Sequence, residues 1–268
     1  MNVGNPSPTC VYLSGMPLRL RVLALIAALF LGGCSSAPPY QGLTADELYA
    51  IARTAFEAED HNEAQRSLDA FLISFPSDAR AAEVRMTLAE SYFIDEEYVT
   101  ALSEYQRFID RFPSHASVSD AALGMCRSSA ALSPPIQRDQ AYTAEAQQVC
   151  SNVAIDYPGT PAAAEASRTA AEMRLKLAQK LHQIADYYFR RDFNDSAIIY
   201  WQMVEEQYAD TEWAPRALLG IMNAYEEIGY EDLVAETRKK ILDSYPASEE
   251  ARGLAAGASE PTPSGGAR

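Results

Sequence analysis

The stretch ALSEYQRFIDRFP, from Ala101 to Pro113, has one apolar face and a distinctive ending. Ala101, Tyr105 and Phe108 follow helical spacing, and Phe112-Pro113 closes the segment. Other segments share this spacing and end at Phe75-Pro76, Tyr157-Pro158, Tyr208-Ala209 and, in a weaker copy, Tyr245-Pro246. The recurrence of one helical unit predicts an array of repeats.

Each copy follows another apolar-faced segment, so the repeating unit is a pair of helices. In the second pair, Leu88 and Tyr92 face Ala101 and Tyr105 across a turn at 95–97. This alternation of small and large residues resembles tetratricopeptide (TPR) helices. The predicted fold is all-α: a TPR superhelical solenoid of about five helix-turn-helix repeats, or about ten helices. The alternative, an ordinary helix bundle with fortuitous spacing, leaves the recurring terminal proline unexplained.

The predicted domain starts at a capping box formed by Thr44 and Glu47 and ends near Pro246. Its repeats are expected at about 44–76, 77–113, 114–158, 159–209 and 210–246.

The third and fourth repeats are much longer than the TPR unit, which has about 34 residues. In the third repeat, the stretch Ser133 to Asp139 contains Pro134-Pro135 and lengthens the connection between the helices. In the fourth, an unbroken helical pattern runs from about Pro161 to Arg190 and adds about four turns. This helix should project beyond its neighbours.

Residues 1–33 are predicted to be a signal peptide, with Met16 as a possible true start. Arg19 and Arg21 precede an apolar run that is too short for a permanent membrane span. The sequence Leu31-Gly32-Gly33-Cys34 resembles a bacterial lipobox, which implies acylation of Cys34 and an anchored tether over 34–43. Ser35, where Asp usually signals inner-membrane retention, implies the outer membrane. The alternative is an ordinary cleavage site followed by an incidental cysteine.

The composition favours a folded, acidic body: 48% of residues are hydrophobic, 22% are charged, and the net charge is −15. Loss of residues 1–33 removes two arginines and no acid, so the mature charge becomes −17. Lysine and arginine form no cluster of five or more, which argues against nucleic-acid binding. The tail 247–268, rich in Ala, Gly, Ser and Pro, is predicted to be disordered.

The sequence contains no phosphate-binding loop, nucleophile elbow or metal-ligand spacing. His61, His115 and His182 fall in separate repeats, so we expect no enzyme, cofactor or metal site. Cys126 and Cys150 lie on the two predicted helices of one repeat. They could form a disulfide in an oxidising compartment, or remain two buried thiols.

TPR arrays typically bind partners along a concave surface lined by their first helices. Several polar and aromatic residues of the first two repeats are candidates for that surface: Tyr49, Arg53, Arg85, Glu90 and Tyr92.

Four segments give the chain a more specific resemblance. They are LYAIARTAF (48–56), FPSHASVSDAAL (112–123), RDQAYTAEA (138–146) and LAQKLHQIADYYFRRDFNDSAI (177–198). Together with the lipobox, the third-repeat insertion and the long helix, they resemble the BamD family of the outer-membrane β-barrel assembly (Bam) machinery. The resemblance implies a non-catalytic lipoprotein on the periplasmic face of the outer membrane. Its implied partners are BamA periplasmic domains, unfolded β-barrel proteins and other Bam lipoproteins where these are present.

By position, the resemblance implies that Tyr49, Arg53, Arg85 and Tyr92 face substrate. It also implies that Tyr200, Trp201, Glu205 and Arg216 face BamA. Related proteins carry Arg where Trp201 stands, so a salt bridge is not implied at that position.

The alternative function is that of another periplasmic TPR lipoprotein. A Tol–Pal or peptidoglycan-linked scaffold usually has a coiled coil before its repeats, and no heptad pattern precedes residue 44. Pilus-assembly lipoproteins tend to have more regular repeat lengths. The sequence leaves open the substrate motif and the accessory subunits.

Overall fold

The computed structural model of the protein describes residues 40–257. Within this range the chain forms eleven α-helices and no strand. The helices are α2 (Ala45–Glu57), α3 (His61–Ser74), α4 (Ala81–Ile94), α5 (Tyr98–Arg111), α6 (Val118–Ala131), α7 (Ala141–Asp156), α8 (Pro161–Phe189), α9 (Asn194–Gln207), α10 (Trp213–Ile228), α11 (Glu231–Ser244) and α12 (Glu249–Gly257). The predicted signal peptide, Cys34 and the tether as far as Pro39 lie outside the described residues.

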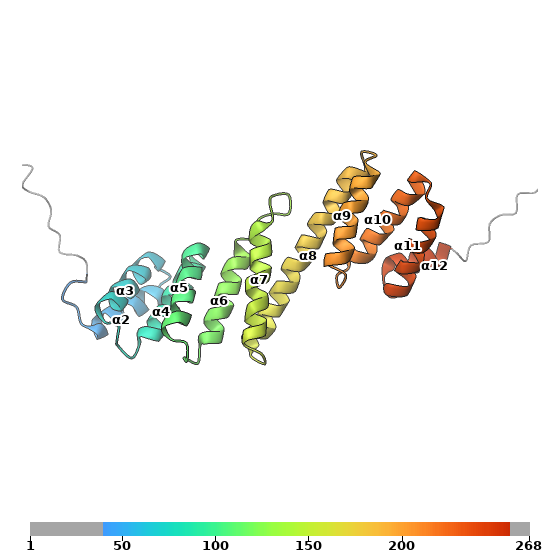
Figure 1. Ribbon diagram of the computed structural model, residues 1–268. Coiled ribbons are helices and arrows are strands. Elements are labelled where there is room, and N and C mark those ends of the chain that lie inside the picture. The colour runs from blue at the N-terminus through green and yellow to red at the C-terminus, as the bar shows by residue number, and fades with distance from the viewer. Residues whose placement is uncertain (1–39, 258–268) are drawn as a thin grey trace, which may run out of the picture. The chain divides into compact units, whose positions relative to one another are not determined.

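The helices from α2 to α11 form five consecutive pairs, visible as the colour runs from blue to red in Figure 1. Each helix packs against the next one in the chain, and the first helices of neighbouring pairs also touch, as α6 and α8 do. Contacts restricted to neighbours are the property that defines a helical repeat array. The prediction of an all-α TPR solenoid is confirmed.

The array begins at the predicted capping box. The Thr44 backbone N–H donates to Glu47 Oε2 over 2.8 Å, and the Glu47 N–H donates to Thr44 Oγ1 over 3.3 Å. These bonds satisfy two backbone donors that the first turn of a helix leaves without intrahelical partners. The hydrogen bond from the Thr44 backbone also lowers the pKa of Glu47.

The recurring aromatic residue ends each second helix. Its backbone leaves helical geometry while its N–H still donates to the carbonyl four residues earlier: Phe75, Phe112, Tyr157, Tyr208 and Tyr245. A following proline disfavours helical dihedrals in the residue before it. Tyr208 adopts the same geometry before Ala209, with φ of −130°, so the proline is not indispensable.

At two of the junctions between successive pairs, an aromatic ring lies against a glycine of the next helix. A Cβ on Gly124 of α6 would lie 2.4 Å from Tyr105 Cζ of α5. A Cβ on Gly220 of α10 would lie 2.5 Å from Trp201 Cε2 of α9. These glycines let the next helix approach the ring closely, and both rings are buried.

The two lengthened repeats meet in the structure. The insertion forms the connection between α6 and α7, and α8 runs unbroken for 29 residues from Pro161. Lys176 Nζ on α8 donates to Ser133 Oγ over 2.7 Å, and the Ser133 and Thr143 hydroxyls are 2.6 Å apart. The added turns of α8 therefore dock on the inserted connection.

Cys126 of α6 and Cys150 of α7 form a disulfide, with their Cα atoms 4.7 Å apart. Both residues are fully buried, and the cross-link encloses the inserted connection. Closing a loop of this length stabilises a fold by about 3 kcal/mol through loss of unfolded-state entropy. The third pair is thus fixed covalently despite its long connection.

The prediction of disorder from Ala247 is wrong for residues 249–257, which form α12. Ser248 Oγ accepts the Ala251 N–H over 3.0 Å, and Ala251 is buried in a core shared with α9, α10 and α11. The small residues that suggested disorder include an apolar helical face, and a terminal helix covers the apolar surface that the last pair would otherwise expose. Residues 258–268 lie outside the described range.

Replacing Gly220 should show how much the ring contact contributes to folding. Gly220→Ala should lower the free energy of unfolding by about 1–3 kcal/mol, because the new methyl group overpacks the Trp201 ring. Gly253→Ala is the matched control, since no atom lies within 4 Å of its Cβ position, and it should be neutral or stabilising. Urea unfolding checks both variants, and equal stability of the two would contradict the packing argument.

Candidate functional site

The predicted substrate face in the first two repeats is a set of interacting polar groups. Tyr49 Oη on α2 donates to Glu83 Oε1 on α4 over 2.6 Å, and this bond raises the pKa of Tyr49. The Arg80 guanidinium lies 5.0 Å from the Tyr49 ring centre, a cation–π distance. Arg80 also holds the pKa of Asp78 down to about 2 through their hydrogen bond. Tyr49 is therefore half-buried and oriented by the fold.

Arg85 forms a salt bridge with a buried carboxylate. Its Nη1 donates to Glu104 Oε2 over 2.6 Å, and Arg107 pairs with the other oxygen of the same carboxylate. The Glu104 side chain is only 5% exposed, so the two cations compensate a charge that the fold has removed from water. Arg85 thus has a structural role that its position in the sequence did not indicate.

The other two predicted substrate residues differ in exposure. Arg53 is open to solvent, and among residues 40–257 its salt-bridge partner is Glu57, one helical turn later, over 2.8 Å. Tyr92 is half-buried; its pKa is raised first by burial and then by the carboxylates of Asp69 and Glu104. Tyr49, Arg53 and Tyr92 thus keep some surface for a partner.

In the fourth and fifth repeats, a hollow of about 290 Å³ lies between α8 and α10. His182 lines it, with ring centres 6.1 Å from Trp201 and 5.2 Å from Trp213. Burial lowers the pKa of His182, although Asp186, 3.3 Å away, favours the charged form. Asn223 is exposed beside it. The hollow therefore combines aromatic rings with hydrogen-bonding groups.

The prediction that Trp201 lies on a partner-facing surface is wrong. Trp201 is 2% exposed because its ring fills the space against Gly220, although the residue also lines the hollow. The indole Nε1 has no hydrogen-bond partner among the described residues. Trp201 is therefore part of the core.

The remaining predicted partner residues are accessible. Tyr200 stacks on Tyr188 at 5.5 Å. Arg216 pairs with Glu212 over 2.8 Å and lies 4.8 Å from the Trp213 ring centre. Glu205 pairs with Lys240 of α11 over 3.0 Å. These contacts hold the side chains in place and leave part of each exposed.

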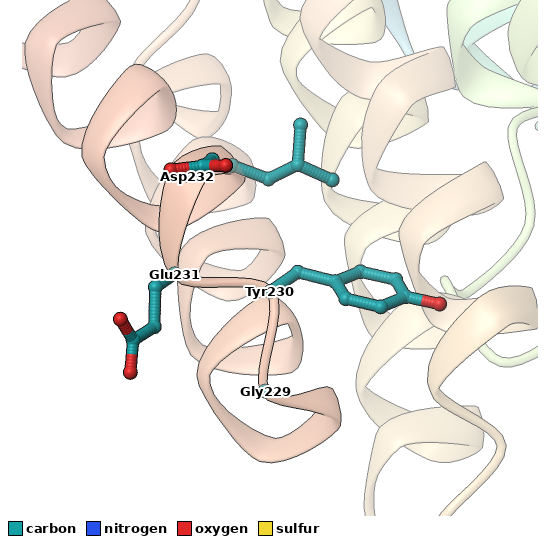
Figure 2. A pocket seen from close by; sticks show the side chains of 5 residues that line it. Gly229, Tyr230, Glu231 and Asp232 are labelled. Carbon is teal, nitrogen blue, oxygen red and sulfur yellow. The ribbon is translucent and has the colours of Figure 1, made fainter.

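The sequence did not indicate two hollows around α11. One, of about 230 Å³, lies between α9 and α11 over α10. The other, of about 560 Å³, lies at the α10–α11 turn, where Gly229 has φ of +88° (Figure 2). Helical periodicity identifies buried faces but does not show where two exposed faces enclose a groove.

A family model described as YfiO, outer membrane lipoprotein, matches residues 41–241. The chain belongs to this family. Its curated relatives include "Outer membrane protein assembly factor BamD" of Vibrio cholerae, 25% identical over 230 residues, covering 80% of this chain and 94% of that protein. The BamD of Pasteurella multocida is 24% identical over 231 residues, covering 82% and 89%. The predicted membership of the BamD family is confirmed.

Solved structures with similar helical arrays have lower identity to this BamD-family chain. The TPR2AB domain of yeast Sti1 in its pHSP90 complex is 12% identical with a TM-score of 0.41, covering 80% of this chain and 82% of that one. A TPR protein of Thermus thermophilus is 15% identical with a TM-score of 0.34, covering 80% and 98%. Across residues 40–257, none of the helices has the length and apolar character needed to cross a membrane.

Two arginines on the predicted substrate face of this BamD-family protein should respond differently to truncation. Arg85→Ala should lower the free energy of unfolding by about 2–3 kcal/mol, because Glu104 stays buried with one cation fewer. Arg53→Ala should change it by about 0–0.5 kcal/mol, since its ion pair is exposed. Thermal or urea unfolding measures both, and similar losses for the two variants would show that Arg85 is not structural.

Proposed function

We propose that this protein is a non-catalytic scaffold of the Bam complex, held on the periplasmic face of the outer membrane by acylated Cys34. Its fourth and fifth repeats bind the periplasmic domains of BamA, and its first two repeats receive unfolded β-barrel proteins. Other Bam lipoproteins join where they are present. The observation that carries the proposal is the family match over 41–241, which spans nearly all of the helical array.

The geometry of the fourth and fifth repeats supports a protein partner. Tyr200, Arg216 and Asn223 present an aromatic ring, a cation and an amide that are each at least partly exposed. Aromatic residues and arginine are the types that contribute most at protein interfaces. Trp201 supports this surface from the core, and Glu205 belongs to the separate groove beside α11.

The geometry of the first two repeats supports recognition of a flexible segment. Tyr49 and Tyr92 keep part of each ring exposed, and ordered side chains such as these lose little entropy on binding. Arg53 adds an exposed cation. Arg85 contributes to this surface indirectly, because its salt bridge with Glu104 holds α4 against α5.

Isolation of membrane complexes tests the BamA interface. The tagged full-length chain, extracted in detergent, should co-purify BamA, whereas Tyr200→Ala with Arg216→Glu should reduce BamA recovery about tenfold by removing a contact and reversing a charge. Arg66→Glu is the charge-matched control because Arg66 is exposed on α3, in the first repeat. Recovery of Tol–Pal or pilus components without BamA would overturn the proposal.

The lipid anchor has a separate test, in which a cleavable secretory leader replaces residues 1–33 and Cys34→Ala follows it. This chain should be found in the soluble periplasm, since each buried CH₂ of an acyl chain contributes about 0.8 kcal/mol to membrane binding. The natural leader with Ser35→Ala is the control and should remain on the membrane. If the chain without Cys34 also stays there, acylation is not its anchor.

A further inference from the structure

The groove between α9 and α11 has an apolar floor and acidic walls. Leu218, Ile221 and Tyr225 of α10 form the floor, and the first two are almost fully buried. Glu205 and Glu206 line the α9 side. Along the α11 side the groove is lined by Leu233, Glu236, Thr237 and Lys240.

The charges of this groove are only partly compensated within the chain. Lys240 pairs with Glu205 over 3.0 Å. Glu206 and Glu236 are exposed, and neither side-chain carboxylate has a salt bridge or hydrogen bond to another residue of the described range. Three carboxylates therefore share one ammonium group, and like charges around one groove oppose folding when no cation joins them.

The second hollow adjoins this groove at Leu233, which lines both. Tyr230 is 53% exposed and Leu233 is 37% exposed, so two large apolar side chains are open to solvent at one turn. In Figure 2 the Tyr230 ring and the Glu231 carboxylate point away from each other. Glu231 and Asp232 lie in the first turn of α11, where the helix dipole stabilises a carboxylate. These two acids are therefore explained by folding.

We propose that the two hollows together bind a positively charged segment of a partner protein that also carries an apolar anchor. The inference rests on the proposed function in one respect, that the fourth and fifth repeats hold a protein partner. A Lys or Arg side chain would lay its aliphatic stem on Leu218, Ile221 and Tyr225 and place its charged head between Glu206 and Glu236. An apolar side chain of the same segment would cover Tyr230 and Leu233.

Charge complementarity selects this occupant. The chain carries a net charge of −15, so a second copy would bring further negative charge to the groove. An acidic segment would meet two carboxylates without partners, and a purely apolar one would leave them uncompensated. A basic segment turns the unfavourable arrangement into charge-assisted hydrogen bonds.

A binding measurement with defined peptides tests the groove. The probe is a fluorescent peptide of alternating leucine and lysine, added to the purified mature chain without its lipid and followed by anisotropy. Glu206→Lys with Glu236→Lys should weaken binding about tenfold. Asp156→Lys with Glu172→Lys is the control: it makes the same charge change on α7 and α8, at exposed acids, and should have an effect below about twofold in physiological salt.

Two further variants keep the test independent of any folding defect. Glu206→Gln with Glu236→Gln removes the charges at constant shape and should weaken binding of the lysine peptide, with a melting temperature no lower than that of the unaltered chain. Leu233→Ala should also weaken binding of the lysine peptide and leave the salt dependence of that binding unchanged. Equal weakening by the control pair, or equal binding of a leucine–glutamate peptide, would overturn the inference.

BamA recovery on the same variants separates this inference from the proposed function. If the unaltered chain recovers no BamA, the proposed function fails and the peptide result alone decides on the groove. If BamA is recovered but substitution of Glu206 and Glu236 leaves the affinity for the lysine peptide unchanged, the groove inference fails and the proposed function stands.

Discussion

Two of the four junctions between helix pairs depend on an aromatic ring that lies against a glycine of the next helix. Tyr105 lies against Gly124 and Trp201 against Gly220, each joining the second helix of one pair to the first helix of the next. A helix pair cannot bury its apolar face alone, so each such contact makes the stability of one repeat depend on its neighbour. The same constraint explains α12, which covers the face that the last pair would otherwise expose.

The two departures from the repeat length form one structural feature. The connection inserted in the third pair is enclosed by the Cys126–Cys150 disulfide and contacted by Lys176 from the long helix α8. A long polar connection alone would be flexible, and a projecting helix alone would expose its side chains to solvent. Because each supports the other, this junction forms the link between the first three pairs and the last two.

Sequence reasoning was accurate where a local rule determines the structure. Helical spacing gave the pairs, the Thr44–Glu47 box gave the first cap, and the unbroken pattern after Pro161 gave α8. It failed where a distant partner decides the structure. Trp201 is buried because Gly220 makes room for its ring, and Arg85 is structural because it pairs with the buried Glu104. Residues 249–257 are helical, with Ala251 buried in a core that earlier helices form. The acidic groove needs α9 and α11 side by side, which no single segment reveals.

The carboxylates at the two ends of the array differ in whether a cation pairs with them. In the first two repeats, Glu104 is buried and compensated by Arg85 and Arg107, and Asp78 is compensated by Arg80, so folding accounts for these charges. Around α11, Glu206 and Glu236 remain uncompensated over a floor of buried Leu218 and Ile221. Folding gains nothing from that arrangement, since neutral residues would cover the same floor without repulsion. A basic partner segment of the kind proposed would complement these acidic walls over their apolar floor, and the proposed surface on α9 and α11 adds to the one expected on the first helices of the array.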